Sequence, residues 1–259
     1  MLLTSLVEEL RFGAVFPELA GARVMISGVS SSFGVDISRA FAEHHARLLL
    51  QMSETSIEMD EVTAMLAQSA GGLKVYDGQL QKADEAADFA RGPAQHAFGG
   101  LDVLINLITL TPGDLVSTGA LEEVEALVSQ KLLAPTLMSR IVANRMRLTW
   151  TQGLILNVLS TPPVKDARDA ALASFFGATL ATISRKEAEK WAHEGIRINA
   201  VSHARATPPL SESRDHASQI HAGRNTASEP ELAALALYLA SQRGASFSGQ
   251  VFDTALVEI

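Results

Sequence analysis

Seven short apolar runs, rich in Val, Ile and Leu, recur along the chain with helical patterns between them. They span residues 23–27, 47–52, 73–76, 103–107, 154–159, 197–201 and 250–253. Most are apolar at successive positions, which is typical of parallel strands covered by helices on both faces. We therefore predict an α/β fold with a doubly wound, seven-stranded parallel sheet.

Helical patterns fill the intervals between the predicted strands. They span residues 33–45, 57–69, 83–97, 121–147, 167–194 and 231–241. Thr55 and Glu58 match a capping box that opens the second helix. Proline lacks an amide donor, so we expect Pro93 to break the third helix and Pro135 to kink or split the fourth.

The length of 259 residues suits one domain that buries a full core, and no stretch resembles a linker. We predict an N-terminal extension at residues 1–18 and a single Rossmann-type domain at 19–259. No segment combines a basic start, an apolar core and a cleavage site, and no apolar run reaches the length of a membrane span. We therefore expect a cytoplasmic protein without a membrane anchor.

The charge balance limits the partners. The 29 acidic and 21 basic side chains leave a net charge of -8, which disfavours binding to nucleic acid and to anionic membranes. The chain has no cysteine, which excludes disulfides, thiolate metal sites and a cysteine nucleophile. We expect neither nucleic acid, membrane nor metal as a partner.

The first predicted strand ends in S-G-V-S-S-S-F-G, residues 27–34, and leads directly into a helix. This turn resembles that of the short-chain dehydrogenase/reductase family, which has T-G-x-x-x-G-x-G with a serine here in place of the middle glycine. The resemblance implies NAD(P) as cofactor, because glycines let its pyrophosphate approach the helix N-terminus. An equal alternative is that the glycines serve only a tight turn. The implied contact residues are Gly28, Ser30, Ser32, Phe33 and Gly34.

Further cofactor positions differ from the family pattern. Met52 stands where the family has the acidic residue that holds the NAD ribose, and Ser53 beside it favours NADP slightly because a hydroxyl can bond a phosphate. Asp77 matches the family's aspartate near the adenine, or is a turn residue. Asn106 is the one position of the family's N-N-A-G that remains. Together with Ser32, these changes predict that NAD(P) binding is weak or lost.

Two motifs fix the alignment of the catalytic region. Residues 153–161, G-L-I-L-N-V-L-S-T, resemble the family's fifth strand with Ser160 as its catalytic serine, and residues 194–201, E-G-I-R-I-N-A-V, resemble H-G-I-R-V-N-A-V. Counts from both motifs place the family's tyrosine at Ala173 and its lysine at Gly177. Neither residue can exchange a proton with a substrate or hold a nicotinamide ribose, as the family's pair does.

Two other family positions hold polar residues. Lys131 replaces an asparagine of the fourth helix, and we interpret it as a lysine that extends its amine to solvent rather than as a catalytic group. His203 follows the sixth strand, beside the family's nicotinamide pocket, and is the best remaining proton-transfer candidate by residue type. A structural role for this histidine is the simpler interpretation. The loop 207–228 is expected at the ligand crevice.

The resemblance spans residues 19–257, and the fold motifs persist while the catalytic and cofactor positions change together. We expect a catalytically silent family member that acts as a subunit of a homo-oligomer or beside a related active subunit. Phe175 and Phe176 place aromatic side chains on two faces of the fifth helix, which favours such an interface. Two alternatives stay open: an oxidoreductase with a rewired site that uses Ser160, His203 or Lys131, and a sensor of small molecules or nucleotides.

Overall fold

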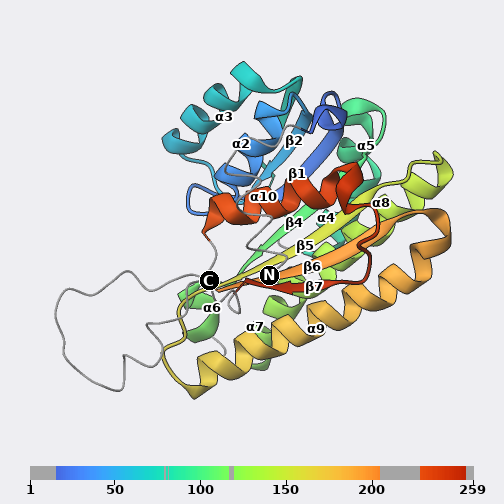
Figure 1. Ribbon diagram of the computed structural model, residues 1–259. Coiled ribbons are helices and arrows are strands. Elements are labelled where there is room, and N and C mark those ends of the chain that lie inside the picture. Colours follow the sequence, from blue (N-terminus) through green and yellow to red (C-terminus); the bar gives the residue numbers. More distant parts are fainter. Residues whose placement is uncertain (1–15, 79, 81, 117–119, 205–227, 255–259) are drawn as a thin grey trace.

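The computed structural model describes residues 16–78, 80, 82–116, 120–204 and 228–254. Within them, seven parallel strands form one sheet in the order β3-β2-β1-β4-β5-β6-β7, which confirms the predicted fold (Figure 1). The strands are β1 (Arg23–Val29), β2 (Arg47–Met52), β3 (Gly72–Tyr76), β4 (Val103–Thr109), β5 (Leu154–Thr161), β6 (Arg197–Ala204) and β7 (Val251–Asp253).

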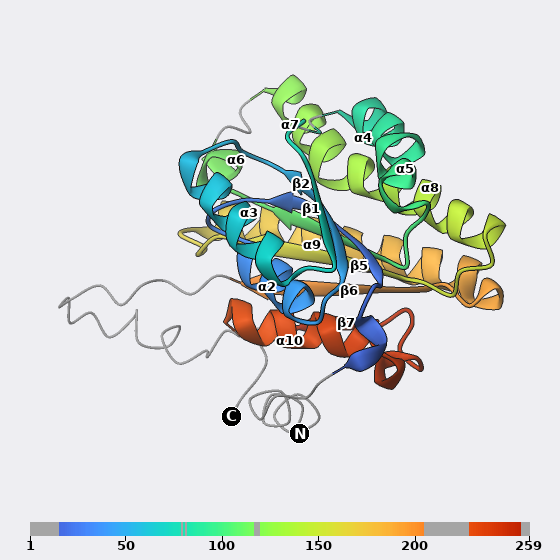
Figure 2. The same cartoon turned by 90° about the horizontal axis from the view of Figure 1, so that it is seen from above.

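Two helical layers sandwich this sheet, as Figure 2 shows. The helices α2, α3 and α10 cover one face, and α4, α5, α8 and α9 cover the other. Their bounds, with those of two shorter helices, are α2 (Val35–Glu43), α3 (Ile57–Ser69), α4 (Ala83–Arg91), α5 (Pro93–Phe98), α6 (Pro112–Val116), α7 (Leu121–Val128), α8 (Ala134–Leu148), α9 (Ala167–Trp191) and α10 (Glu229–Ala240). Phe16 and Leu19 are buried in the first layer, so packing begins within the predicted extension.

The central strands run two or three residues beyond their predicted ends. Backbone pairing continues past the apolar runs, so polar residues extend β4, β5 and β6 at their carboxyl ends. Thr109 pairs in register with Ser160, and Ser160 pairs with His203. Because residues in register on parallel strands point to the same face, these three residues form one polar row.

Both proline predictions are confirmed, whereas the capping prediction is wrong by one residue. The α4 helix ends at Arg91, and Pro93 opens α5. The N-cap of α3 is Ser56, whose side chain accepts a hydrogen bond from the Met59 amide at 3.2 Å. Ser56, directly after Thr55, offers the same kind of hydroxyl acceptor, and both residue types are favoured at N-caps.

Pro135 splits the long predicted helix through a π-helical turn at Ser129–Leu133, between α7 and α8. A proline ring collides with the carbonyl group four residues earlier, here that of Lys131, and offers that carbonyl no amide. A wider turn relieves both problems, and such turns are frequent at functional sites. The turn brings Lys131 beneath the end of β4, where it contacts Thr109.

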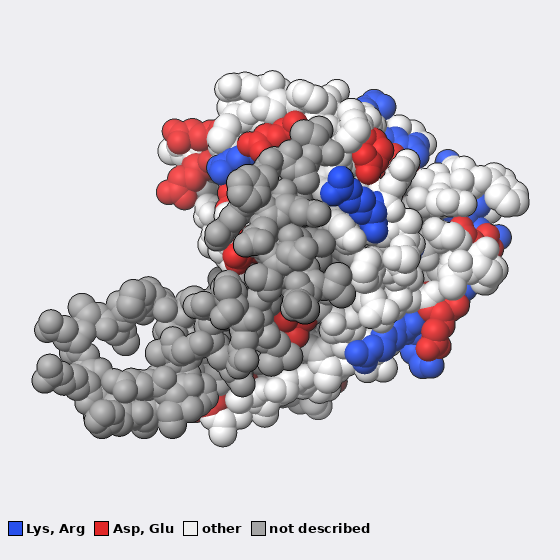
Figure 3. Space-filling view, in the orientation of Figure 1, with Lys and Arg blue, Asp and Glu red and all other residues white. Residues whose placement is uncertain are grey.

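No helix in the described ranges is both long enough and apolar enough to cross a membrane. Figure 3 shows acidic and basic side chains interspersed on one face of the molecule, rather than gathered by sign. The expected crevice loop at residues 207–228 lies outside the described residues except for Ser228.

Candidate functional site

A cavity of about 380 Å³ opens at the carboxyl ends of β1, β2 and β4. The strand order reverses between β1 and β4, the place where open α/β sheets bind ligands. The cavity is rich in hydroxyl and amide groups. Its polar lining residues are Ser27, Ser30, Ser32, Gln51, Ser53, Glu54, Asn106, Thr109, Thr111, Gln130 and Lys131.

The two glycines of the first turn are required by packing. Gly28 and Gly34 have φ angles of 81° and 99°, in the left-handed region that favours glycine. A Cβ atom on Gly28 would overlap the carbonyl oxygen of Leu107, and one on Gly34 would overlap its side chain. The approach of β4 therefore accounts for both glycines without any ligand.

Most backbone amides of the turn after β1 donate hydrogen bonds to carboxylate or carbonyl oxygens of this chain. The amides of Ser30 and Phe33 donate to each other's carbonyl oxygens, at 2.9 and 3.3 Å. Glu229, the first residue of α10, accepts the amides of Gly34 and Asp36 at 2.8 and 2.9 Å. Burial raises the pKa of Glu229, although these hydrogen bonds oppose the shift. An internal carboxylate thus fills the anion-binding position at the α2 N-terminus.

A second carboxylate, Glu54, lies over the same turn and was not among the residues predicted from the sequence. The amide and hydroxyl of Ser53 both donate to the Val29 carbonyl, at 2.9 and 3.0 Å, which folds the chain after β2 back over β1. Glu54 then accepts the Ser31 amide at 2.7 Å. Hydrogen bonds from the side chain and the amide of Ser31 lower its pKa. An acidic residue two positions past Met52 was the available signal.

The other predicted cofactor residues have mixed placements. Asn106 is almost fully buried, and its amide donates to Ser139 and Asn157 at 2.9 and 2.8 Å, so its polar atoms serve contacts between the sheet and α8. Asp77 is exposed and does not line the cavity. Gln51 lies there instead and accepts the Gly28 amide at 2.8 Å.

Lys131 points into the crevice, so the expectation that its amine extends to solvent was wrong. Its Nζ donates to the Thr109 carbonyl at 2.9 Å and lies 3.4 Å from Oδ2 of Asp114. The side chain is only 15% exposed. Lys131 lies in the π-helical turn, and its spacing from Leu127 and Val128 already predicted that its side chain begins on an inward face.

Two of the three residues in the polar row, Ser160 and His203, are buried, whereas Thr109 is half-buried and lines the cavity. Ser160 is fully buried, and among the described residues neither its hydroxyl nor that of Thr109 has a hydrogen-bond partner. His203 is 5% exposed and stacks on Phe33, with ring centroids 5.7 Å apart and an interplanar angle of 9°. Its Nδ1 lies 3.3 Å from the hydroxyl of Thr254. Ser160 and His203 therefore resemble packed core rather than an open reaction site.

Ala173 and Gly177 lie in α9, one helical turn apart on one face, and both are half-buried. A Cβ atom on Gly177 would make only an ordinary contact of 3.8 Å with Leu159. Close packing against the sheet thus does not require glycine here. A longer side chain has room to begin at this position.

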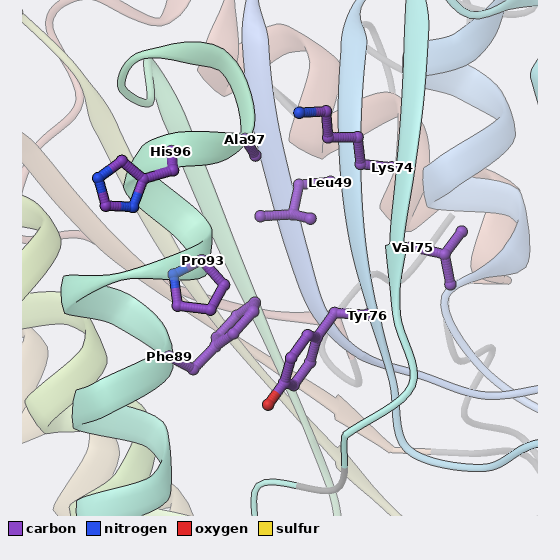
Figure 4. Close-up of a pocket in the computed structure, with 8 residues that line it drawn as sticks. All are labelled: Leu49, Lys74, Val75, Tyr76, Phe89, Pro93, His96 and Ala97. Atoms are coloured by element: carbon purple, nitrogen blue, oxygen red, sulfur yellow. The ribbon is translucent and has the colours of Figure 1, made fainter.

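Neither tyrosine of the chain lies near this helix face. Tyr76 stands on the edge strand β3, four strand spacings from β5, a separation of roughly 19 Å. It packs on Phe89 at a ring-centroid distance of 4.3 Å, beside a second cavity of about 210 Å³ (Figure 4). Tyr238 is in α10 and packs on Phe247.

The residues present fit one half of a dinucleotide and not the other. The open cavity offers hydroxyls, amides and the Glu54 carboxylate, which suit a ribose and its linked groups. On the β5 side, the described residues bring no tyrosine or lysine to Ser160. No cluster of metal-binding side chains occurs in the described part of the chain either.

Comparisons with known proteins agree with this fold. D-threitol dehydrogenase of Mycolicibacterium smegmatis is 27% identical over 244 residues, covering 89% of this chain and 90% of that protein. A solved Serratia marcescens short-chain dehydrogenase/reductase variant has a TM-score of 0.75 at 20% identity, covering 92% of this chain and 98% of its own. A Burkholderia cenocepacia short-chain dehydrogenase solved in complex with NADP has a TM-score of 0.73 at 18% identity, covering 91% and 96%.

The family model described as enoyl-(acyl carrier protein) reductase matches residues 28–254. This match spans every strand of the sheet beyond the first part of β1 and includes the turn, the crevice and α9. The chain therefore belongs to this family of short-chain dehydrogenases/reductases.

Proposed function

We propose that this chain is a catalytically silent member of its oxidoreductase family and acts as a subunit of an oligomer, with itself or with a related active chain. One observation carries the proposal: Ala173 and Gly177 occupy the α9 positions that should supply the proton donor and the lysine beside Ser160. A dehydrogenase must move a proton to or from the substrate oxygen, and a serine hydroxyl alone is a poor acid and base.

The two replacement candidates have other partners. The Lys131 amine donates to the Thr109 carbonyl at 2.9 Å and lies 3.4 Å from the Asp114 carboxylate, so both contacts tie it to β4 and α6. His203 is buried against Phe33 and Thr254. These contacts favour structural roles for both residues over a rewired oxidoreductase site.

The surface of α9 supports the oligomer part of the proposal. Phe176 is 1% exposed beneath the helix, whereas its neighbour Phe175 is 50% exposed. Leu133 and Val164 are similarly exposed. Large apolar side chains on an outer helix face are typical of surfaces that bury themselves against a second subunit.

Catalytic silence is tested by a gain-of-function pair. The substrates tested are D-threitol and D-beta-hydroxybutyrate, because relatives of this chain are named as dehydrogenases of these compounds. We expect no turnover of either with NAD or NADP. Because the unmodified protein is expected to be inactive, Ser160→Ala should leave the background rate unchanged. The double variant Ala173→Tyr, Gly177→Lys restores the family's residue types, and its activity is measured in the same assay. Turnover by the unmodified protein that Ser160→Ala abolishes would contradict the proposal.

The oligomer is tested by light scattering on the purified protein. Phe175→Asp should yield smaller particles, because a charge in an apolar interface is costly to bury. Ile57→Asp is the matched control, since Ile57 is 80% exposed on α3. A wild-type mass equal to the chain mass of 27.6 kDa would rule out the homo-oligomer and leave assembly with a different chain.

The open cavity favours a second candidate function, sensing of a nucleotide. A polar crevice of about 380 Å³ lies beside Ser160 and His203, which are both buried. Binding of NAD(P) is expected to be weaker than micromolar, which corresponds to about -8 kcal/mol, because the nicotinamide side lacks the family's lysine. Calorimetric titration with both cofactors measures this affinity, and micromolar binding would contradict the expected loss.

A further inference from the structure

The second cavity, of about 210 Å³, lies at the β3 edge of the sheet, on the face that α4 and α5 cover (Figure 4). No described residue lines both this cavity and the crevice at the first turn. Leu49 of β2 and Lys74 of β3 pair in register, so their side chains point to the same face and both line the cavity. The cavity is therefore a separate place in the fold, which the proposed function does not use.

The inner wall of this cavity is apolar and partly aromatic. Leu49 and Phe89 are 3% and 2% exposed, and the Tyr76 ring packs on Phe89 with ring centroids 4.3 Å apart. Figure 4 shows Pro93 and Leu49 grouped with these two rings. Flat rings pack favourably against such side chains, and the volume is below the range of about 300–1,000 Å³ that is common for drug-sized ligands. The wall suits a molecule with a single aromatic ring.

Two cations lie beside the cavity, and neither has an ion pair within the described residues. Phe98, which follows the lining residue Ala97, packs over β3, where a Cβ atom on Gly72 would lie 3.7 Å from its ring. The guanidinium of Arg47 lies 4.5 Å from the centre of this ring, and the ammonium of Lys74 lies 5.4 Å from it. Two like charges that contact one ring repel each other, and a bound anion would relieve this repulsion.

Lys74 is the cation that can reach a ligand in the cavity. Figure 4 shows its side chain extending from β3 toward the α5 side, whereas the ring of His96 points away from Leu49. None of the described lining residues is acidic. A lysine ammonium has three donors and forms short, charge-assisted hydrogen bonds with a carboxylate.

We propose that this cavity binds a small aromatic carboxylate, with its ring against Tyr76 and Phe89 and its carboxylate beside Lys74. A neutral aromatic molecule would leave the cations without a counter-charge. A small aliphatic acid would leave the aromatic wall uncovered. The inference is independent of catalytic silence and of nucleotide binding, because both of those concern the crevice.

An NMR titration of the isotope-labelled protein with benzoate tests the proposal. Benzoate should shift the backbone amides of β3 and α5 in a saturable way, with a dissociation constant of about 1 mM or lower. Benzamide keeps the ring without the charge, and acetate keeps the carboxylate without the ring. Each should bind about fivefold more weakly than benzoate or worse, because each lacks one of the two contacts.

Lys74→Gln should weaken the binding of benzoate by about fivefold or more and leave that of benzamide unchanged. Lys190→Gln is the matched control, because Lys190 is also exposed and its ammonium lies 5.0 Å from the centre of the Trp191 ring. This variant should keep the wild-type affinity, and thermal melting checks that both variants are folded.

Four results would each overturn the proposal. Benzoate could fail to bind at about 10 mM, or benzamide or acetate could bind as tightly as benzoate. Lys74→Gln could keep the wild-type affinity for benzoate, or the shifted amides could be confined to the crevice. Turnover assays and titrations with NAD(P) judge the proposed function separately, so its failure and the failure of this inference are distinguishable.

Discussion

The two halves of the crevice differ in what their polar groups do. On the β1, β2 and β4 side, hydroxyls, amides and two charged groups line an open cavity. On the β5 and β6 side, Ser160 and His203 are buried, and Phe33 stacks on the imidazole. The first half presents polar side chains to a ligand, whereas the side chains of the second half are buried in the protein core.

This difference shows that one motif can persist for two reasons. Gly28 and Gly34 are retained next to the open half, yet the Leu107 carbonyl leaves no space for a side chain at Gly28, and the φ of 99° at Gly34 favours glycine there. At Gly177 the opposite holds, because a side chain could begin there with only an ordinary contact. A matching glycine thus need not mark a binding site, and a lost side chain need not reflect a lack of space.

The largest effect is expected where the closed half is most core-like. Phe33→Ala should lower the free energy of unfolding by about 3–5 kcal/mol, because it removes a fully packed ring and leaves a cavity beside His203. Trp150→Ala is the control, since Trp150 is 90% exposed and its truncation should change stability by about 0.5 kcal/mol or less. If denaturant unfolding shows only a small loss of unfolding free energy for Phe33→Ala, the side chains around Phe33 can rearrange to fill the cavity and are not tightly packed.

Gly28→Ala should also destabilise the fold, through steric overlap with the Leu107 carbonyl as well as backbone strain. Gly21→Ala isolates the strain, because Gly21 has a φ of 75° and a Cβ added there would meet no neighbour within 4 Å. We expect about 1–2 kcal/mol for Gly21→Ala and a further 1–3 kcal/mol for Gly28→Ala. If thermal or urea unfolding shows equal losses of stability for the two variants, steric overlap does not explain the glycine at position 28. Close approach of a ligand would then be the better explanation.

Glu229 should contribute to stability through the two α2 amides that it accepts. Glu229→Ala should cost about 1–2 kcal/mol, whereas Glu229→Gln keeps an oxygen acceptor and should cost less. Because burial raises its pKa, the native state holds this proton more tightly than the unfolded state. Stability from this group is therefore present below the ordinary pKa of 4.5 and is lost as pH rises through the raised value.

The matched measurement is the unfolding free energy of wild type and Glu229→Gln across this pH range. The stability of the glutamine variant relative to wild type should increase as pH rises above 4.5 and then level off. A constant difference would mean that the carboxyl group has the same pKa in the folded and unfolded states.

The smallest effect concerns the nicotinamide itself. NAD and ADP-ribose, which lacks only the nicotinamide, should bind with dissociation constants within about threefold of each other, a difference of about 0.65 kcal/mol. Neither Ala173 nor Gly177 of α9 offers a polar side chain to the missing group. Tighter NAD binding by tenfold or more in calorimetry would show that the closed half opens to admit ligand.

Apolar patterning was enough to predict the sheet, because seven short runs, most of them apolar at successive positions, leave few alternatives to a doubly wound fold. It also predicted the breaks at Pro93 and Pro135, since a missing amide acts locally. Patterning could not predict the strand ends. At Thr109, Ser160 and His203 the backbone pairing continues although the apolar pattern has stopped.

Residue types alone determined which groups are available to this protein, including the alanine and glycine in α9. Only the tertiary structure decided where Glu54 and Lys131 act. A bend after β2 brings the Glu54 carboxylate onto the first turn, and a π-helical turn brings the Lys131 ammonium to the end of β4. The Glu54 placement depends on contacts between segments distant in sequence, which no local periodicity encodes, and the position of β4 above the turn decides what Lys131 meets.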